Sequence, residues 1–266
     1  MIKYSIIIPV YDRPFELSCC LARLNLQSHQ RDQFEIIICD DGSTEDTMKL
    51  VRHYDPLLNI KYLWQPDKGF RAGQARNMGA KISLGQNLVF LDSDIIVREN
   101  WLSSFDVLSI ENPECIICGR YDFLWPQKLV VENIINDFDK VVSNGFPITH
   151  RPKGELLGAD IRKGLFEKYK EQGEPMSGCG GAMFGGNTLV PKSAFNTLGG
   201  FDEYFVSHGG EDNDAGQTLD ELGYKFIFSE KMMAWHIYHS RNQSANVKAL
   251  FKNIRYIDAK HKGSKP

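Results

Sequence analysis

Three apolar runs, each ending in acidic or other polar residues, constrain the fold of this chain most strongly. The runs SIIIPV, FEIIICDD and NLVFLDSD occupy residues 5–10, 34–41 and 87–94. Continuous runs of this kind are typical of strands buried on both faces of a parallel sheet. Helical patterns separate or follow them, at residues 13–26, 44–54 and 72–83. This alternation predicts an α/β domain with a mostly parallel sheet flanked by helices, in which ligands bind at the carboxyl ends of strands.

The rest of the chain carries a less regular succession of patterns. We expect strands at residues 114–123, 186–191 and 224–229, and helices at 126–142, 160–171, 192–198, 211–222 and 248–260. Proline and glycine predict a loop over 145–158, and glycines crowd 173–186. We therefore divide one domain into a strand–helix half (1–105), a variable helical and loop insertion (106–177), and a C-terminal half with a final helix (178–266).

Composition excludes several classes of protein. The 266 residues include 31 Lys+Arg and 34 Asp+Glu, a net charge of −3, with 42% hydrophobic residues. These values argue against a disordered or membrane-embedded chain, and they give no electrostatic reason to expect nucleic acid as a partner. No apolar run reaches the roughly 18 residues that span a bilayer, and the N-terminus does not resemble a signal peptide. We expect a cytoplasmic protein.

The 6 cysteines are expected to be reduced thiols, because a chain of this length can bury a sufficient core without disulfides. Cys115 and Cys118 enclose two isoleucines, a spacing that formally matches a metal or redox motif. Their apolar surroundings favour a buried strand instead.

Two carboxylates close the third run, in the sequence Leu91-Asp92-Ser93-Asp94. Oxygen ligands at the carboxyl end of a parallel strand suit Mg²⁺ or Mn²⁺ held together with a diphosphate. The alternative is an ordinary turn or helix cap, which a pair of aspartates also favours.

The second run ends in Asp40-Asp41-Gly42-Ser43. An aspartate at this strand end could accept hydrogen bonds from a nucleobase or ribose, as the acidic residue of dinucleotide-binding folds does. The alternative is a simple turn with a helix cap. Both can hold together, with Asp40 facing a ligand and Ser43 capping the helix.

Glycine pairs precede two further acidic clusters, at residues 199–203 and 209–214. Glu211 and Asp212 open a predicted helix, and its positive N-terminal field is expected to lower their pKa values and keep a base ionised. By spacing alone, a charged first helical turn is the simpler interpretation.

The run Trp235-His236-Ile237-Tyr238-His239 supplies two histidines late in the chain. A lone histidine is more often packed or solvent-exposed than a ligand. Combined with an aspartate and phosphate oxygens, however, an imidazole gives a plausible Mn²⁺ shell.

Together, these motifs resemble inverting glycosyltransferases of the GT-A fold, whose sheet is Rossmann-like. The runs SIIIPVYDRP, ICDDGSTEDT, DKGFRAGQARNMGA and VFLDSDIIV are similar to the nucleotide-binding half of family 2 enzymes. The run FGGNTLVPKSAFNTLGGFDEYFVSHGGEDNDAGQTLDELGYKF resembles the acceptor half of bacterial chondroitin-polymerase modules and β-galactosyltransferases. The resemblance covers residues 4–105 and 178–240 and leaves 106–177 unassigned.

The resemblance implies roles for individual residues. On the donor side, the expected binding residues are Pro9, Tyr11 and Arg13 around uracil and ribose, Asp40 at the base, Arg76 and Asn77 beside the diphosphate, and Asp92 with Ser93 near the ribose. Asp94 and His236 would hold the metal, with His239 as the competing ligand. Asp212 would be the general base and Glu211 would hold the acceptor. His208 stands where relatives often carry an aromatic residue that stacks on the acceptor sugar.

The implied activity is metal-dependent transfer, with inversion, of a hexose or N-acetylhexosamine from a UDP-sugar to a hydroxyl of a saccharide or glycolipid. Mn²⁺ (or Mg²⁺) would be the cofactor, polysaccharide biosynthesis the setting, and any association with the inner face of the membrane would be peripheral and through the acceptor. Residues 145–186 are expected to form a lid or acceptor loop that orders when donor binds.

Three other functions remain open. They are a retaining transferase of the same fold, a non-catalytic module that binds nucleotide sugar or glycan, and a nucleotidyltransferase. The last is the weakest, because the first strand is not followed by a glycine-rich pyrophosphate loop with a lysine.

Overall fold

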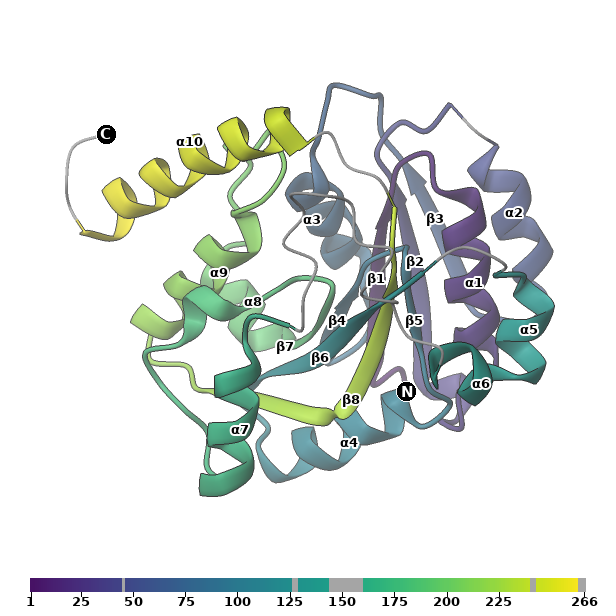
Figure 1. Cartoon of the computed structure of the whole chain (residues 1–266), viewed down its shortest axis with the longest axis horizontal. Coiled ribbons are helices and arrows are strands. Elements are labelled where there is room, and N and C mark those ends of the chain that lie inside the picture. The colour runs from purple at the N-terminus through teal and green to yellow at the C-terminus, as the bar shows by residue number, and fades with distance from the viewer. Residues whose placement is uncertain (45, 126–128, 144–159, 240–242, 263–266) are drawn as a thin grey trace.

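A computed structural model describes residues 1–44, 46–125, 129–143, 160–239 and 243–262 of the chain. Its strands form one eight-stranded sheet in the order β3-β2-β1-β4-β7-β6-β8-β5 (Figure 1). The strands are β1 (Tyr4–Val10), β2 (Phe34–Asp40), β3 (Ile60–Trp64), β4 (Asn87–Leu91), β5 (Ile95–Val97), β6 (Ile116–Leu124), β7 (Asn187–Pro191) and β8 (Phe226–Ile237). The helices are α1 (Pro14–Asn25), α2 (Thr47–Tyr54), α3 (Ala72–Ile82), α4 (Trp101–Glu111), α5 (Val131–Asn136), α6 (Phe138–Ser143), α7 (Lys163–Gln172), α8 (Lys192–Leu198), α9 (Glu211–Glu221) and α10 (Gln243–Lys262).

The expected parallel arrangement is confirmed in the first half of the chain. Strand β1 pairs in parallel with both β2 and β4, and β2 pairs in parallel with β3. All seven residues of β2 are buried, which explains why its sequence does not alternate with polar residues. Successive side chains point to opposite faces, so Ile6 and Ile8 pack with α1, α2 and α4, whereas Ile7 packs with α3, α8 and α9.

Helix α3 lies close to the sheet because it carries glycine where it crosses β1 and β2. A Cβ atom added at Gly79 would lie 2.7 Å from both the Sγ of Cys39 and a methyl carbon of Ile7. No side chain larger than hydrogen fits this crossing without a shift of the helix.

The second half of the chain adds antiparallel pairs. Strand β7 runs antiparallel between β4 and β6, β8 runs parallel to β6, and β5 runs antiparallel to β8. The register of the last pair sets Ile95 opposite His236. The acidic residues that follow β4 therefore lie beside the C-terminal end of a strand more than 130 residues further along the chain.

Several expectations at the level of elements need correction. Strands β3 and β5 and helix α4 were not predicted. β3 is only partly buried, and β5 has only three residues. The predicted helix 126–142 is two short helices, α5 and α6, and β8 and α10 are longer than expected. Asp46, rather than Ser43, caps α2: its side chain accepts from the backbone N–H of Lys49, while the Ser43 hydroxyl accepts from the backbone N–H of Asp12.

The thiols behave as expected from the sequence. All six cysteines are free, five of them are buried, and Cys118 lies within β6 with Cys115 just before it. Of the loop predicted at 145–158, no residue lies in the described part of the chain, so the proposed lid is described only from residue 160 onward. Among the described residues, no helix is long and apolar enough to span a bilayer.

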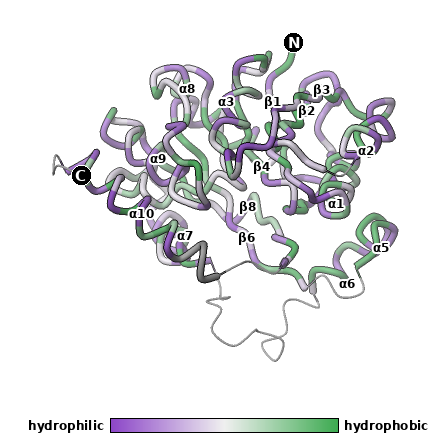
Figure 2. The backbone as a smooth tube through the Cα atoms, turned by 90° about the horizontal axis from the view of Figure 1, so that it is seen from above, coloured by the Kyte–Doolittle hydropathy of each residue, from purple (hydrophilic) through white to green (hydrophobic). Residues whose placement is uncertain are grey.

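The molecule is elongated along the sheet. Both views place α9 and α10 at one end and α1 and α2 at the other (Figures 1 and 2).

Candidate active site

A cavity of about 620 Å³ opens at the carboxyl ends of β1, β2 and β4 and is closed by the C-terminal half of the chain. Its wall includes Pro9, Val10, Tyr11, Arg13, Asp41, Phe70, Arg76, Asp92, Ser93, Asp94, Tyr121, Phe184, His208, Glu211, Asp212, Asn213, His236, His239 and Leu250. Twelve of the fourteen residues to which the family resemblance gave a role therefore line a single cavity. The exceptions are Asp40 and Asn77.

Asp94, His236 and His239 form a cluster in this cavity. One ligand atom from each lies within 4.8 Å of the others. The Nε2 atoms of His236 and His239 lie 3.3 Å and 2.9 Å from Oδ2 of Asp94. A carboxylate and imidazoles at these separations make a donor set that suits Mn²⁺ among the divalent ions.

The second ring nitrogens distinguish the two histidines. Nδ1 of His236 lies 3.0 Å from the backbone carbonyl of Ile237, which can only accept, so Nδ1 carries the proton. Nε2 of neutral His236 then has a lone pair directed at a carboxylate oxygen 3.3 Å away, an arrangement that a cation between the two atoms would stabilise. A backbone carbonyl that fixes the tautomer in this way is typical of metal-ligating histidine.

His239 has the opposite tautomer. The guanidinium of Arg13 donates to its Nδ1 over 3.0 Å, and arginine cannot accept, so the proton of neutral His239 lies on Nε2. That Nε2–H donates to Asp94 over 2.9 Å. His239 thus orients Asp94 as it stands, and the geometry favours His236 as the ligand.

Arg76 joins the acid that follows β4 to the acid that opens α9. Its guanidinium lies 2.7 Å from Oδ1 of Asp92 and 2.9 Å from Oε1 of Glu211, and it is almost fully buried. Burial lowers the pKa of Arg76, but the charges of Asp92 and Glu211 more than offset this effect and raise it overall. Because the guanidinium stays charged, it holds the two carboxylates at fixed positions in the wall.

The two carboxylate oxygens of Glu211 differ in their partners. Oε1 is paired with Arg76, whereas Oε2 is buried and has no hydrogen-bond partner among the described residues. A buried carboxylate oxygen without a hydrogen-bond donor costs free energy, so this atom is suited to accept a hydrogen bond from a hydroxyl of a bound ligand.

Asp212 is held by the backbone. Its Oδ2 accepts from the N–H of Gly185 and its Oδ1 from the N–H of Asn213, each over 2.9 Å. These bonds fix the carboxylate at the cavity wall. The first turn of α9, preceded by Gly210 in a left-handed conformation with φ 105°, thus presents Glu211 and Asp212 together.

The expected effect of the helix on Asp212 is wrong in sign. Burial and the adjacent charge of Glu211 raise the pKa of Asp212 to about 6, despite the charge of Arg76 and the two backbone N–H bonds. Low local polarity outweighs the helix field here. The carboxylate is still mainly ionised at pH 7, but with a proton affinity well above that of a surface aspartate.

Asp40 and Asn77 occupy structural positions. Asp40 accepts from the backbone N–H groups of Gly42 and Ser43 and from the Tyr62 hydroxyl, and it is 1% exposed. Its neighbour Asp41 lines the cavity instead. The sequence analysis selected Asp40 rather than Asp41 because both acids stand at the end of the same strand. Only the turn that follows decides which of the two faces the cavity.

Asn77 fastens α3 to the glycine pair before Phe201. Its side chain donates to the carbonyl of Phe201 over 2.9 Å and accepts from the N–H of Phe201 over 2.8 Å. Gly200 leaves the space, since an added Cβ would lie 2.9 Å from Oδ1 of Asn77. The side chain of Asn77 therefore bonds the backbone of Phe201 and does not line the cavity where the resemblance implies a diphosphate.

Tyr11 apart, the aromatic residues of the wall were not identified from the sequence. The Tyr121 ring lies 6.0 Å from that of His236 and 6.4 Å from that of Phe184, measured between centroids, and both aromatic residues line the cavity. Phe70 packs edge-on against His208, with ring centroids 5.5 Å apart. No spacing signal could have paired residues 70 and 208, because only the fold brings the two halves of the chain together.

Two protein-family models match the chain. The model described as glycosyl transferase family 2 matches residues 5–166, more than half of the sequence. The chain belongs to glycosyl transferase family 2. A second model, described as the N-terminal domain of galactosyltransferase, matches residues 179–241, the segment that carries Glu211, Asp212 and His236.

Curated relatives of this family 2 chain include synthases of polysaccharides. It is 32% identical over 256 residues to a hyaluronan synthase of Pasteurella multocida, with 94% of this chain and 26% of the relative covered. It is 29% identical to a validoxylamine A glucosyltransferase of Streptomyces hygroscopicus (97% and 60% covered) and 29% identical to an Escherichia coli chondroitin synthase (94% and 37%). The chain thus spans about a quarter to three fifths of the length of these three relatives.

Solved structures confirm the fold. Staphylococcus aureus TarS (residues 1–349) in complex with UDP-GlcNAc superposes with a TM-score of 0.70 at 16% identity, covering 97% of this chain and 66% of that one. The mannosyltransferase PcManGT of Pyrobaculum calidifontis, in complex with GDP-Man and Mn²⁺, gives a TM-score of 0.62 at 16% identity, covering 99% and 68%. The family 2 chain therefore has the mixed α/β GT-A fold predicted from its sequence.

Proposed function

We propose that the chain is a metal-dependent, inverting glycosyltransferase that moves a hexose or N-acetylhexosamine from a UDP-sugar to a hydroxyl of a saccharide or glycolipid. The observation that carries the proposal is one cavity in which the Asp94–His236–His239 cluster and the Asp212 carboxylate of raised pKa share a wall. Neighbours of the same fold that bind UDP-GlcNAc, or GDP-Man with Mn²⁺, support a nucleotide-sugar donor.

The donor nucleoside is assigned to the N-terminal half. Pro9, Tyr11 and Arg13 from the loop after β1, with Asp41 after β2, line the side of the cavity where the parallel strands end. Ser93 lies between the two acids that follow β4. We place the sugar between this loop and the first turn of α9.

Asp94 and His236 would hold the divalent ion, and His239 would orient Asp94 through its Nε2–H. When bound, the ion neutralises negative charge that develops on the departing diphosphate. Arg76 is occupied by Asp92 and Glu211, so we assign it to positioning those carboxylates rather than to direct contact with phosphate.

Asp212 is proposed to take the proton of the attacking acceptor hydroxyl. A general base works best when its pKa lies near the working pH, and a value of about 6 meets that condition better than that of an ordinary aspartate. The acceptor oxygen, as it loses its proton to Asp212, attacks the anomeric carbon while the bond from that carbon to the diphosphate breaks. A single displacement inverts that carbon. The buried Oε2 of Glu211 would accept a hydrogen bond from a second hydroxyl of the acceptor saccharide.

Phe70 and His208 are suited to contact the acceptor sugar. Both line the cavity, and Phe70 remains 36% exposed. Phe70 can therefore supply, from the N-terminal half, the apolar ring surface that His208 lacks.

The deciding experiment is turnover of a panel of UDP-, GDP- and dTDP-sugars with Mn²⁺ and saccharide acceptors, followed by NMR of the product anomer. We expect UDP-sugar turnover with inversion. A product of retained configuration supports a retaining transferase instead, and donor binding without turnover supports a non-catalytic module.

Two variants and a control complete the test. Asp94→Ala and Asp212→Asn should each abolish most of the activity. Asp139→Asn, at a position 83% exposed by side chain and outside the cavity, should behave like the parent protein. Full activity of Asp94→Ala under limiting metal would refute the assignment of the metal site.

A further inference from the structure

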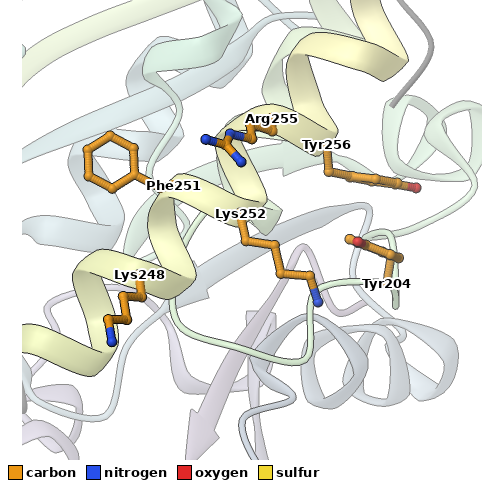
Figure 3. A pocket seen from close by; sticks show the side chains of 6 residues that line it. All are labelled: Tyr204, Lys248, Phe251, Lys252, Arg255 and Tyr256. Atoms are coloured by element: carbon orange, nitrogen blue, oxygen red, sulfur yellow. The ribbon is translucent and has the colours of Figure 1, made fainter.

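A second cavity lies on the C-terminal helix, outside the site described above. It has a volume of about 620 Å³ and is lined by Tyr204, Lys248, Phe251, Lys252, Arg255 and Tyr256 (Figure 3). Five of these six residues belong to α10. The lining combines three cationic side chains with three aromatic rings and, among the residues that the structure describes, includes no acidic one, although the whole chain has a net charge of −3.

The aromatic part of this cavity is organised by contacts. The rings of Tyr204 and Tyr256 stack with centroids 3.8 Å apart and planes 13° from parallel. The Tyr256 hydroxyl donates to Asp202 over 2.9 Å. Lys252 extends toward the Tyr204 ring, with its ammonium 5.6 Å from the centroid (Figure 3). The stacked pair thus forms a fixed wall, and one cation is held beside it.

Phe251 adds an exposed ring. It is 63% exposed, more than any other aromatic residue among the large hydrophobic residues exposed in the described chain. Sugar rings present apolar C–H faces that pack on aromatic rings, while carboxylate or phosphate groups pair with lysine and arginine. The lining therefore has groups for both parts of an acidic saccharide.

The same helix reaches the active-site cavity. Leu250, next to Phe251 in the sequence, lines that cavity. Asn253 is 2% exposed and donates to the carbonyl of Gly209 over 2.6 Å, which ties α10 to the turn before Glu211. A ligand lying along α10 could therefore contact the basic and aromatic cavity while its end lies near Asp212.

We propose that this cavity is a subsite for an acidic saccharide, and that it binds a part of the acceptor remote from the reacting hydroxyl. The inference rests on the proposed function for its meaning, because it assigns the substrate class of that site. Charge complementarity selects the ligand: three cations without an acid in the lining would give no advantage to a neutral chain. A flat anionic membrane would use the cations but not the stacked tyrosine wall.

The test is binding of oligosaccharides to the full chain without donor, measured by calorimetry. The acidic probe is a hexamer of galacturonate, and the neutral probe is maltohexaose. We expect Lys252→Ala with Arg255→Ala to weaken hexagalacturonate binding at least about tenfold and to leave maltohexaose binding unchanged, because only charge-assisted contacts are removed. Phe251→Ala should weaken binding of both probes. Added salt should reduce the difference between the two probes.

A matched control removes the same charge elsewhere. Lys168→Ala with Lys170→Ala changes two exposed side chains of α7, well away from α10 in Figure 1, and this variant should bind both probes like the parent protein. Thermal melts of every variant establish that the fold is retained.

The outcomes separate this inference from the proposed function. Equal hexagalacturonate affinity of the parent and of the Lys252/Arg255 double variant overturns the subsite. A second result also overturns it: the parent protein binds vesicles of equal parts phosphatidylglycerol and phosphatidylcholine but not hexagalacturonate, and the double variant loses the vesicle binding. That result indicates a membrane surface. Charge-dependent hexagalacturonate binding with no turnover of any nucleotide sugar refutes the transferase and leaves the subsite standing. If the double variant turns over a nucleotide sugar and its KM for an acidic acceptor is unchanged, the subsite is refuted and the transferase stands.

Discussion

His236 and His239 lie side by side at Asp94 but differ in what their Nδ1 atoms contact. His236 is fixed by a carbonyl, and His239 by the Arg13 guanidinium. We predict that His236→Ala raises the Mn²⁺ concentration needed for half-maximal activity by about 10- to 100-fold or abolishes activity. His239→Gln, which can still donate to Asp94, should shift it much less. Titrating activity with Mn²⁺ measures both effects, and an opposite order would reverse the assignment of ligand.

The environment of Asp212 leads to a prediction about catalysis. Asp212→Asn should lower kcat by about 10²- to 10⁴-fold, the usual contribution of a general base, and leave UDP-sugar binding nearly unchanged. In the parent protein, kcat/KM should rise with pH through about 6, because the base must lose its proton to act and its pKa is raised. A profile that is flat between pH 5 and pH 7 would contradict the role of Asp212.

The same pKa has a consequence for stability. The folded protein holds the Asp212 proton up to about pH 6, whereas the unfolded chain releases it near the ordinary aspartate pKa of 3.8. Between these values the folded state binds more protons, so this group makes the free energy of unfolding fall as pH rises. We predict that the Tm of Asp212→Asn relative to the parent increases from about pH 4 to about pH 7. A constant difference in Tm would argue against a raised pKa.

At the scale of elements, the packing of α3 on the sheet depends on the absence of a side chain at Gly79. We predict that Gly79→Ala destabilises the protein by about 1–3 kcal/mol, because the added methyl group would overlap Cys39 and Ile7. The matched control is Gly164→Ala in α7, where an added Cβ meets nothing within 4 Å. That change should stabilise the helix by up to about 1 kcal/mol. Urea unfolding of both variants measures the contrast.

At the scale of the whole molecule, α10 supports the active site from the far end of the chain. Asn253 bonds the carbonyl of Gly209, and Lys260 and His261 both contact Asp214 of α9. We predict that Asn253→Ala lowers Tm, at a cost of about 1–3 kcal/mol for the unsatisfied carbonyl, and raises the KM for acceptor. Donor affinity should not change, because the donor residues lie on the first half of the chain. A selective loss of UDP-sugar binding in this variant would contradict that division.

The sequence alone determined the class of fold and pointed to many of the residues that line the cavity. Apolar runs such as FEIIICDD have no polar face, so as strands they bury their side chains in a sheet covered on both faces, and the acids that end parallel strands then meet at one edge. For this reason Asp92 and Asp94 could be selected from local pattern, whereas Glu211 and Asp212, which open α9, were selected through the family resemblance. The sequence of one segment is enough to predict a buried strand, because that prediction depends only on how apolar and polar side chains follow one another within the segment.

The tertiary structure decided what depends on contacts between distant segments. The antiparallel register of β5 and β8 brings His236 to Asp94, the turn after β2 turns Asp40 inward and Asp41 toward the cavity, and Arg76 joins Asp92 to Glu211. The pKa of Asp212 shows the same limit. The helix position predicted a lowered value, but burial and the charge of Glu211 raise it. Desolvation and Coulomb interactions act through space, so they are fixed only when the whole chain has folded.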